Sequence, residues 1–303
     1  FRVLDDDDVV GVDIGADGTT VRWRRANGST TPPLARPVPV TALLASSGIH
    51  SDHMGNEIDE QPAVARRVLD ALAPGIADGS LWRGLGLPSL ARIERVAILG
   101  CGTSLHAGRA VGGTFARLAG LPTRTVIASE AAHEVWEPNT LVLALSQSGE
   151  TADVLRALDA IPAGTRTVLA LTNNPASSLG RRADAVIDCL AGPEIGVAAT
   201  KTFIAQVLTG VSVALSGLAS AGIADAAALD ADMRALERVP DALAAALVQG
   251  AERMPSLAVE WDTASGFLFL GRGAGLVYAA EGALKLKELS YRWAEAQPAG
   301  ELK

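Results

Sequence analysis

Cysteine, aromatic side chains and positive charge are all scarce in this chain. Its 303 residues include two cysteines, 4% aromatic residues, and 26 lysines and arginines against 34 aspartates and glutamates, which leaves a formal net charge of -8. Two cysteines do not make a disulfide scaffold and fit a reducing compartment, so we expect a cytoplasmic protein. The acidic balance, without a basic stripe interleaved with aromatic residues, argues against a nucleic-acid partner.

Histidine is also sparse, and the common cofactor signatures are missing. His50 and His53 form an H-x-x-H pair that we interpret as a surface coincidence rather than a metal site. A dinucleotide fingerprint is disfavoured because Leu105 stands where G-x-G-x-x-G requires a glycine, and no P-loop G-K-[ST] occurs. We therefore expect neither a metal nor an organic cofactor.

One long apolar run, residues 203–221, raises the question of a membrane span. Polar residues and glycines recur through it, which favours a buried core or interface helix, and we expect no membrane partner. No signal peptide is visible, because the chain opens with Phe1 and soon reaches an acidic run. The missing initiator methionine and the abrupt end at Lys303 lead us to expect a piece of a longer gene product.

Hydrophobic residues make up 49% of the chain, enough for one large or two ordinary domains. Residues 1–31 alternate apolar and polar around turn signals, which predicts two or three short antiparallel strands. A proline-rich linker from Pro32 and a helical connector should fill residues 32–90, with helical periodicity from Met54 to Leu72.

Short β-rich runs that alternate with helix-like segments dominate residues 91–250. This pattern predicts a buried parallel sheet flanked by helices, a doubly wound α/β fold. The expected strands are Val96–Leu99, Thr125–Ala128, Leu141–Leu145, Thr167–Leu171 and Ala185–Asp188, and the expected helices are 104–119, 129–136, 150–160, 176–183, 200–221 and 225–250. Residues 251–303 repeat the opening, with a strand at Gly266–Gly271 and a helix at about 277–296, so we expect the start of a second, truncated domain of the same kind.

Two hydroxyl-rich turns follow strands of this pattern: Cys101, Gly102, Thr103 and Ser104 after the first, and Ser146 to Thr151 after the third. Unpaired N–H groups at such strand-to-helix turns, together with the helix dipole, favour an anion. The competing interpretation is ordinary helix capping, which contributes about 1 kcal/mol. Three hydroxyls and an amide (Ser146, Gln147, Ser148, Thr151) exceed what a cap needs, so we favour a phosphate.

Two further segments leave their interpretations open. Glu281, Lys285 and Glu288 share one helical face, which is either a solvated ion-pair face or a carboxylate and lysine that move protons between adjacent sugar carbons. The loop 194–202 either approaches a sugar with its backbone or is a helix entry capped by Thr200.

These motifs, in this order from Met54 to Lys303, resemble the glucosamine-6-phosphate synthase family, glutamine-dependent fructose-6-phosphate aminotransferases with two sugar-isomerase (SIS) domains. The resemblance implies a flavodoxin-like SIS fold at 91–250, the start of a second SIS domain at 251–303, and a remnant of a glutaminase domain at 1–31. It implies Glu288 as the base of the ketose–aldose isomerisation, with Lys285 beside it. It further implies a substrate-binding set of Cys101, Gly102, Thr103, Ser104, Ser146, Gln147, Ser148, Thr151, Val197 and Ala199.

The family's reaction joins fructose 6-phosphate to ammonia from a glutaminase domain to give glucosamine 6-phosphate, without a cofactor, in a homodimer. Neither the glutaminase nucleophile nor the family's C-terminal lysine lies within this sequence, and Ala199 stands where the family usually has a serine. Two alternatives therefore stay open: a divergent SIS isomerase or deglycase acting on another sugar phosphate, and a sugar-phosphate sensor without catalysis.

Overall fold

The computed structural model describes residues 7–25, 27–32, 48–162, 164 and 166–302, in two units that divide at residues 45 and 46. The first unit contains an antiparallel hairpin of β1 (Val9–Gly15) and β2 (Gly18–Arg24), which confirms the strands predicted within residues 1–31. The predicted proline-rich linker lies almost wholly outside the described residues.

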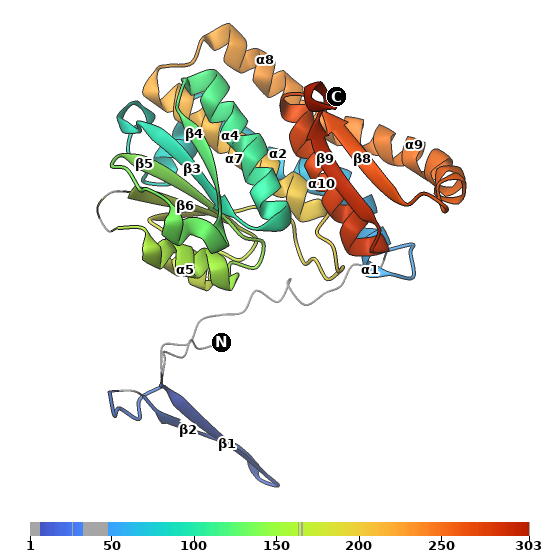
Figure 1. Ribbon diagram of the computed structural model, residues 1–303. Helices are drawn as coiled ribbons and strands as arrows, with labels where there is room; N and C mark the ends of the chain where they lie inside the picture. The colour runs from blue at the N-terminus through green and yellow to red at the C-terminus, as the bar shows by residue number, and fades with distance from the viewer. Residues whose placement is uncertain (1–6, 26, 33–47, 163, 165, 303) are drawn as a thin grey trace. The chain divides into compact units, whose positions relative to one another are not determined.

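The second unit is built on a five-stranded parallel sheet with the order β4-β3-β5-β6-β7 (Figure 1). All five predicted strands are confirmed, and the apolar runs of the three central strands β3, β5 and β6 are buried because helices cover both faces of the sheet. The strands are β3 (Arg95–Gly100), β4 (Thr123–Ile127), β5 (Thr140–Leu145), β6 (Arg166–Thr172) and β7 (Ala185–Asp188).

Alternate residues of each strand supply two separate cores. Ile98 and Leu143 belong to a core that includes residues of α2 (Gln61–Leu72), α4 (Gly102–Ala119) and α7 (Lys201–Ala221). Their neighbours Leu99 and Val142 belong to a second core, with residues of α5 (Ala152–Ala160) and α6 (Ser178–Arg182), on the opposite side of the sheet. The structure therefore has the doubly wound layering that the sequence predicts. The helices around the sheet are α4 (Gly102–Ala119), α5 (Ala152–Ala160), α6 (Ser178–Arg182) and α7 (Lys201–Ala221), with 3₁₀ turns η4 (Ala128–His133) and η3 (Leu90–Arg92). The predicted helix at 129–136 is wrong in type, because η4 occupies this place.

The segment predicted as a connector belongs to the core. Its elements are α1 (His53–Asp59), α2 (Gln61–Leu72), η2 (Ala73–Gly75) and α3 (Ser80–Gly84). Val64 and Trp82 are each 1% exposed, and the Trp82 backbone N–H donates to Ser216 Oγ of α7 at 3.0 Å. Residues 53–84 therefore pack against α7 and form part of the core on that side of the sheet.

Helix α7 is the one helix in the described part of the chain that is long and apolar enough to cross a membrane. None of its residues is exposed, because α2, α3 and α4 surround it. It is a core helix, as one of the two interpretations predicts. Its contribution to a dimer contact stays a prediction.

The C-terminal part departs from the sequence prediction in two places. The single helix predicted at 225–250 is two helices, α8 (Ala226–Glu237) and α9 (Val239–Glu260), and α9 begins with Pro240 in its first turn and runs through the predicted boundary at 250. The strand β8 (Gly266–Gly271) and helix α10 (Ala274–Ser290) follow as predicted.

The helix predicted to reach residue 296 ends at Ser290. Tyr291 has a left-handed backbone (φ 56°), which stops the helix, and β9 (Trp293–Pro298) then pairs in parallel with β8 before a final turn, η5 (Ala299–Glu301). No glycine marks this stop, so the sequence carried no signal for it.

Candidate active site

The two hydroxyl-rich turns lie side by side at the carboxyl edge of the sheet. β3 pairs with β4 on one side and with β5 on the other, so the strand order reverses between β3 and β5. Leu99 is in register with Ala144, which brings the ends of the two strands together. A Cβ on Gly100 would lie 3.2 Å from the Leu145 carbonyl oxygen, so only glycine fits this approach comfortably. The predicted ligand position, at a topological switch point, is where the turns meet.

Hydroxyl groups brace the second turn from inside. Ser146 Oγ accepts from the Gly149 N–H at 3.0 Å and lies 2.8 Å from Thr151 Oγ1, while Ser148 Oγ accepts from the Glu150 N–H at 3.1 Å. Gly149 has φ +68°, and a Cβ there would collide with Ser177 Oγ, so the tight turn requires glycine.

In neither turn does the N-cap side chain form a hydrogen bond that caps the following helix. Cys101 is the N-cap of α4 and Thr151 the N-cap of α5, and neither makes a side-chain cap hydrogen bond. The capping interpretation of the sequence is therefore not what the structure shows. The N–H groups of both first turns remain without a side-chain cap, which is the arrangement an anion needs.

In the first turn, Thr103 faces α10 rather than open space. Its hydroxyl donates to Glu281 Oε1 at 2.8 Å and accepts from Lys285 Nζ at 2.8 Å. A hydroxyl has one proton to donate, and the hydrogen bond to Glu281 uses it. In this arrangement Thr103 offers a ligand only an acceptor lone pair, so it suits a sugar hydroxyl better than a phosphate oxygen.

The face of α10 that carries the three predicted charged residues is buried at Glu281, partly buried at Lys285 and exposed at Glu288. Lys285 Nζ lies 2.6 Å from Glu288 Oε2 and 3.5 Å from Glu281 Oε1. Glu281 is only 7% exposed, and its second oxygen lies 2.8 Å from His106 Nδ1 of α4. Glu288 is the exposed carboxylate of the pair. The solvated ion-pair face is wrong for Glu281 and Lys285, because both are withdrawn from water against α4.

The loop 194–202 is held by two carboxylates, Glu57 from α1 and Glu194 from the loop itself. Glu57 Oε1 accepts from the Ile195 N–H at 2.5 Å and from the Gly196 N–H at 3.2 Å. Glu194 accepts from the Thr200 N–H at 2.8 Å, so it fills the capping role predicted for Thr200, whose side chain makes no cap bond.

The loop's sugar-facing candidates differ in exposure: Val197 is 92% exposed, whereas Ala199 is partly buried. At the start of α7, Lys201 Nζ pairs with Glu60 Oε2 at 2.6 Å with the lysine side chain almost wholly buried. The loop is thus a braced segment of irregular backbone that leads directly into a core helix.

Cys101 lines the first turn as a neutral thiol. Burial raises its pKa, the charge of Asp153 raises it further, and hydrogen bonds from the Ala128 and Ser129 backbone offset only part of this. A thiol with a raised pKa is a poor nucleophile at neutral pH, which agrees with a pocket-lining role.

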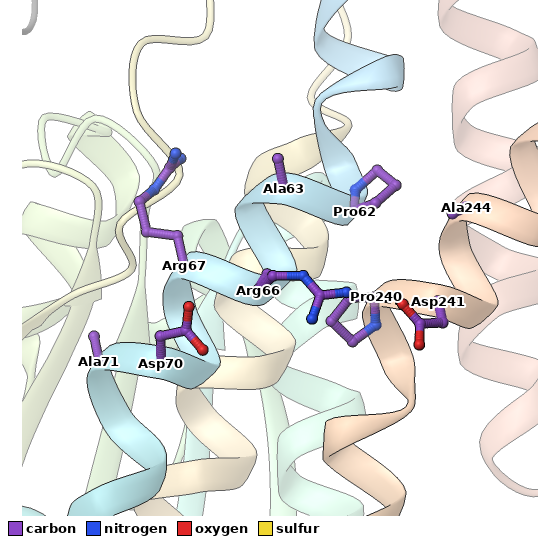
Figure 2. Close-up of a pocket in the computed structure, with 9 residues that line it drawn as sticks. All are labelled: Pro62, Ala63, Arg66, Arg67, Asp70, Ala71, Pro240, Asp241 and Ala244. Atoms are coloured by element: carbon purple, nitrogen blue, oxygen red, sulfur yellow. Dashed lines mark hydrogen bonds and ion pairs between the residues drawn. The ribbon is translucent and has the colours of Figure 1, made fainter.

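An open hollow in the described part of the chain lies elsewhere. Its volume is about 780 Å³, and it sits between α2 and α9, where Arg66 forms an ion pair with Asp241 at 2.8 Å (Figure 2). Its lining residues are Pro62, Ala63, Arg66, Arg67, Asp70, Ala71, Pro240, Asp241 and Ala244, none of which is a predicted site residue. We place the candidate site at the strand ends because the two hydroxyl-rich turns and the charged residues of α10 meet there. No group of three or more His, Cys, Asp or Glu side chains that fits a metal ion occurs among the described residues.

Three residues at this site escaped the sequence analysis. His106 and Glu57 give no local signal, because each acts on a partner more than 130 positions away. Gln206 stands out in the sequence only as a polar residue in an apolar helix, yet its Nε2 lies 3.1 Å from Ser104 Oγ. Ser104 and Thr103 are thus held by α7 and α10, respectively.

The chain is similar to known proteins in both sequence and structure. The SIS domain family model matches residues 89–216. The chain is 41% identical to the glutamine–fructose-6-phosphate aminotransferase [isomerizing] of Gloeobacter violaceus over 82% of this chain and 41% of that protein. It is 40% identical to the protein of the same name from Pseudomonas putida over 86% of this chain and 43% of that protein.

Among solved structures, the C-terminal domain of glucosamine-fructose-6-phosphate aminotransferase from Francisella tularensis aligns with a TM-score of 0.78 and 32% identity, over 86% of this chain and 73% of that one. This likeness confirms the predicted fold class. The chain spans about two-fifths of the length of the curated relatives it matches.

Proposed function

The chain belongs to the glutamine–fructose-6-phosphate aminotransferase family, and we propose that residues 46–302 bind a hexose phosphate and carry its ketose–aldose isomerisation. One observation carries this proposal: Lys285 of α10 contacts Thr103 in the first of two adjacent turns suited to an anion, and Glu288 lies beside that lysine. Proton-transfer groups and a phosphate cradle then face the same ligand.

The second turn would hold the phosphate. Ser146, Ser148, Thr151 and the amide of Gln147 lie around the first turn of α5, with Ser104 across the switch point. Each charge-assisted hydrogen bond to the phosphate would contribute about 1.5–3 kcal/mol before desolvation and ordering costs. Four such bonds suffice for micromolar to millimolar affinity.

Proton transfer would begin at Glu288. Its carboxylate removes a proton from C1 of the open-chain ketose, and the electron pair forms the C1–C2 double bond of an enediol or enolamine. The carbonyl or imine electrons move onto the heteroatom on C2, which takes up a proton. Glu288 then returns its proton to C2 while the C1 hydroxyl releases its own proton, which forms the C1 aldehyde of the aldose. Lys285, 2.6 Å from Glu288, would stabilise the negative charge that develops on the neighbouring oxygen. Thr103 would accept from a sugar hydroxyl, while the backbone around Val197 and Ala199 would line the sugar.

For the whole protein, we propose the reaction of its relatives: fructose 6-phosphate and glutamine give glucosamine 6-phosphate and glutamate, with ammonia delivered from a glutaminase domain. The proton-transfer steps that we assign to this chain use its own side chains and call for no cofactor. We further propose a cytoplasmic homodimer without a nucleic-acid or membrane partner. The two free thiols, Cys101 and Cys189, support a reducing compartment.

Calorimetric binding and solvent deuterium exchange test the proposal together. We expect saturable binding of fructose 6-phosphate and glucosamine 6-phosphate, tighter than that of inorganic phosphate and weakened about 10-fold or more in Ser146→Ala. Deuterium from the solvent should appear at C1 of fructose 6-phosphate by nuclear magnetic resonance. Preference for sedoheptulose 7-phosphate would indicate a divergent isomerase instead. Binding without exchange would indicate a sensor, and no binding would refute the site.

A further inference from the structure

A buried amide lies directly beneath the first turn of the site. Gln206 of α7 is 0% exposed, and its Nε2 donates to Ser104 Oγ at 3.1 Å across 102 positions of sequence. Its other polar atom, Oε1, has no hydrogen-bond partner among the described residues. Burying an amide with half of its hydrogen bonds unmade costs stability, so a purely structural core would favour Leu or Met at this position.

The bond from Gln206 decides what Ser104 can do. A serine hydroxyl has one proton to donate and two lone pairs that accept. Because Gln206 Nε2 fills one lone pair, the Ser104 proton stays available for a ligand. Thr103 is in the opposite state, since its proton is given to Glu281. Of the two hydroxyls in this turn, Ser104 is therefore the one that can donate to an anion.

Two contacts hold the start of α7, immediately before Gln206. One turn earlier on α7, Lys201 is anchored to Glu60, and Phe203 packs edge-on against Tyr278 of α10 with ring centroids 5.9 Å apart. The amide consequently has little freedom to withdraw from Ser104. It links the core helix to the site in the same way that Glu281 links α10.

We propose that Gln206 is a positioning residue that orients Ser104 as a hydrogen-bond donor to the substrate's phosphate or a neighbouring sugar oxygen. This inference rests on the proposed function and deepens it. Gln206 touches Ser104 and not the substrate, so its effect should appear in substrate affinity rather than in the chemical step.

Two substitutions separate orientation from simple packing. Gln206→Met keeps the volume but removes the donor, and we expect the Kd and KM for fructose 6-phosphate to rise about 3–10-fold with little change in turnover at saturation. Gln206→Glu reverses the bond: its carboxylate would accept the Ser104 proton and repel an anion, so affinity should fall about 10-fold or more beyond the Met variant. Ser212→Ala is the matched control, because Ser212 is a fully buried hydroxyl of the same helix that makes no contact with Ser104.

A double-mutant cycle gives the decisive result. If Gln206 acts through Ser104, then Ser104→Ala should cost several-fold in affinity in the wild type and almost nothing in the Gln206→Met background. Additive losses, or a Gln206→Met variant with unchanged affinity, would overturn the inference. A fall in melting temperature shared with Ser212→Ala, without coupling to Ser104, would make Gln206 a structural residue only. If the wild type binds no sugar phosphate, the proposed function fails, and this outcome is distinct from the other two.

Discussion

Thr103 Oγ1 and Lys285 Nζ lie 2.8 Å apart although 182 positions separate them in the sequence. Through this contact the end of the first sheet strand and the helix of the C-terminal part become one site. Thr103 also donates to the buried Glu281, so one hydroxyl joins a lysine, a carboxylate and a strand-to-helix turn.

Removing the Thr103 hydroxyl should damage both stability and activity. Thr103→Val removes the hydroxyl donor to the buried Oε1 of Glu281, and we expect about 1–3 kcal/mol less free energy of unfolding. Urea denaturation measures this directly. Thr103→Ser keeps the hydroxyl and is the control. A valine variant as stable as the wild type would show that the contact contributes nothing.

Glu288→Gln should separate binding from chemistry. The amide keeps the shape but cannot take a proton, so deuterium exchange at C1 should slow by about 10²–10⁴-fold while the Kd for fructose 6-phosphate changes only a few-fold. Glu295→Gln serves as a control, since Glu295 is also exposed and also pairs with a lysine, Lys287. Exchange that persists in Glu288→Gln would contradict its assignment as the base.

The Lys201–Glu60 pair should respond unequally to the loss of each partner. The Lys201 side chain is 3% exposed and that of Glu60 is 29% exposed. Glu60→Leu strands a buried positive charge and should cost about 3–5 kcal/mol, whereas Lys201→Met leaves a carboxylate that still reaches water and should cost less. The double variant should recover part of the loss. Equal effects in thermal and urea unfolding would argue against the buried geometry.

The Cys101 thiol should alkylate slowly at neutral pH. Burial disfavours the thiolate, so the pKa lies above that of a free cysteine, and the fraction of reactive thiolate rises only as the pH approaches this raised value. We expect iodoacetamide labelling, followed by mass spectrometry, to accelerate from pH 7 to pH 10 and to be slowed by bound fructose 6-phosphate. Fast labelling at pH 7 would indicate an activated cysteine. The fully buried Cys189 is the internal control.

Glu57 should govern the order of the loop after β7. Glu57→Leu removes the acceptor of the Ile195 and Gly196 amides, so hydrogen exchange at these two positions should rise by about 10-fold or more while the strands keep their protection. Glu57→Gln retains an acceptor oxygen, so its hydrogen-exchange rates at Ile195 and Gly196 should lie between those of the wild type and Glu57→Leu. Unchanged exchange in Glu57→Leu would mean that other contacts hold the loop.

Local pattern determined the secondary elements wherever one physical signal was strong. Apolar runs such as Leu141–Leu145 can only be buried strands between helices, and glycine-rich turns after them follow from the tight approach of helix to sheet. The same signals did not predict where a helix ends when its end depends on backbone conformation and no glycine marks it, or when a proline lies within an apolar pattern. Tyr291 ends α10 in a left-handed conformation without a glycine, and the break between α8 and α9 follows from a proline that the apolar periodicity obscures.

The sequence by itself therefore determined the parallel sheet, the two hydroxyl-rich turns and the shared face of Glu281, Lys285 and Glu288, because each depends on neighbours within one element or one turn. Only the tertiary structure decided how those groups are used. In the folded chain the Thr103 hydroxyl donates a hydrogen bond to Glu281, and Gln206 donates to Ser104 Oγ, so the Ser104 proton remains available. Glu57 accepts a hydrogen bond from the backbone of the loop. The direction of a hydrogen bond depends on which donor and acceptor atoms lie within about 3 Å of each other. For residues far apart in the sequence, the folding of the chain determines these distances, and sequence spacing does not.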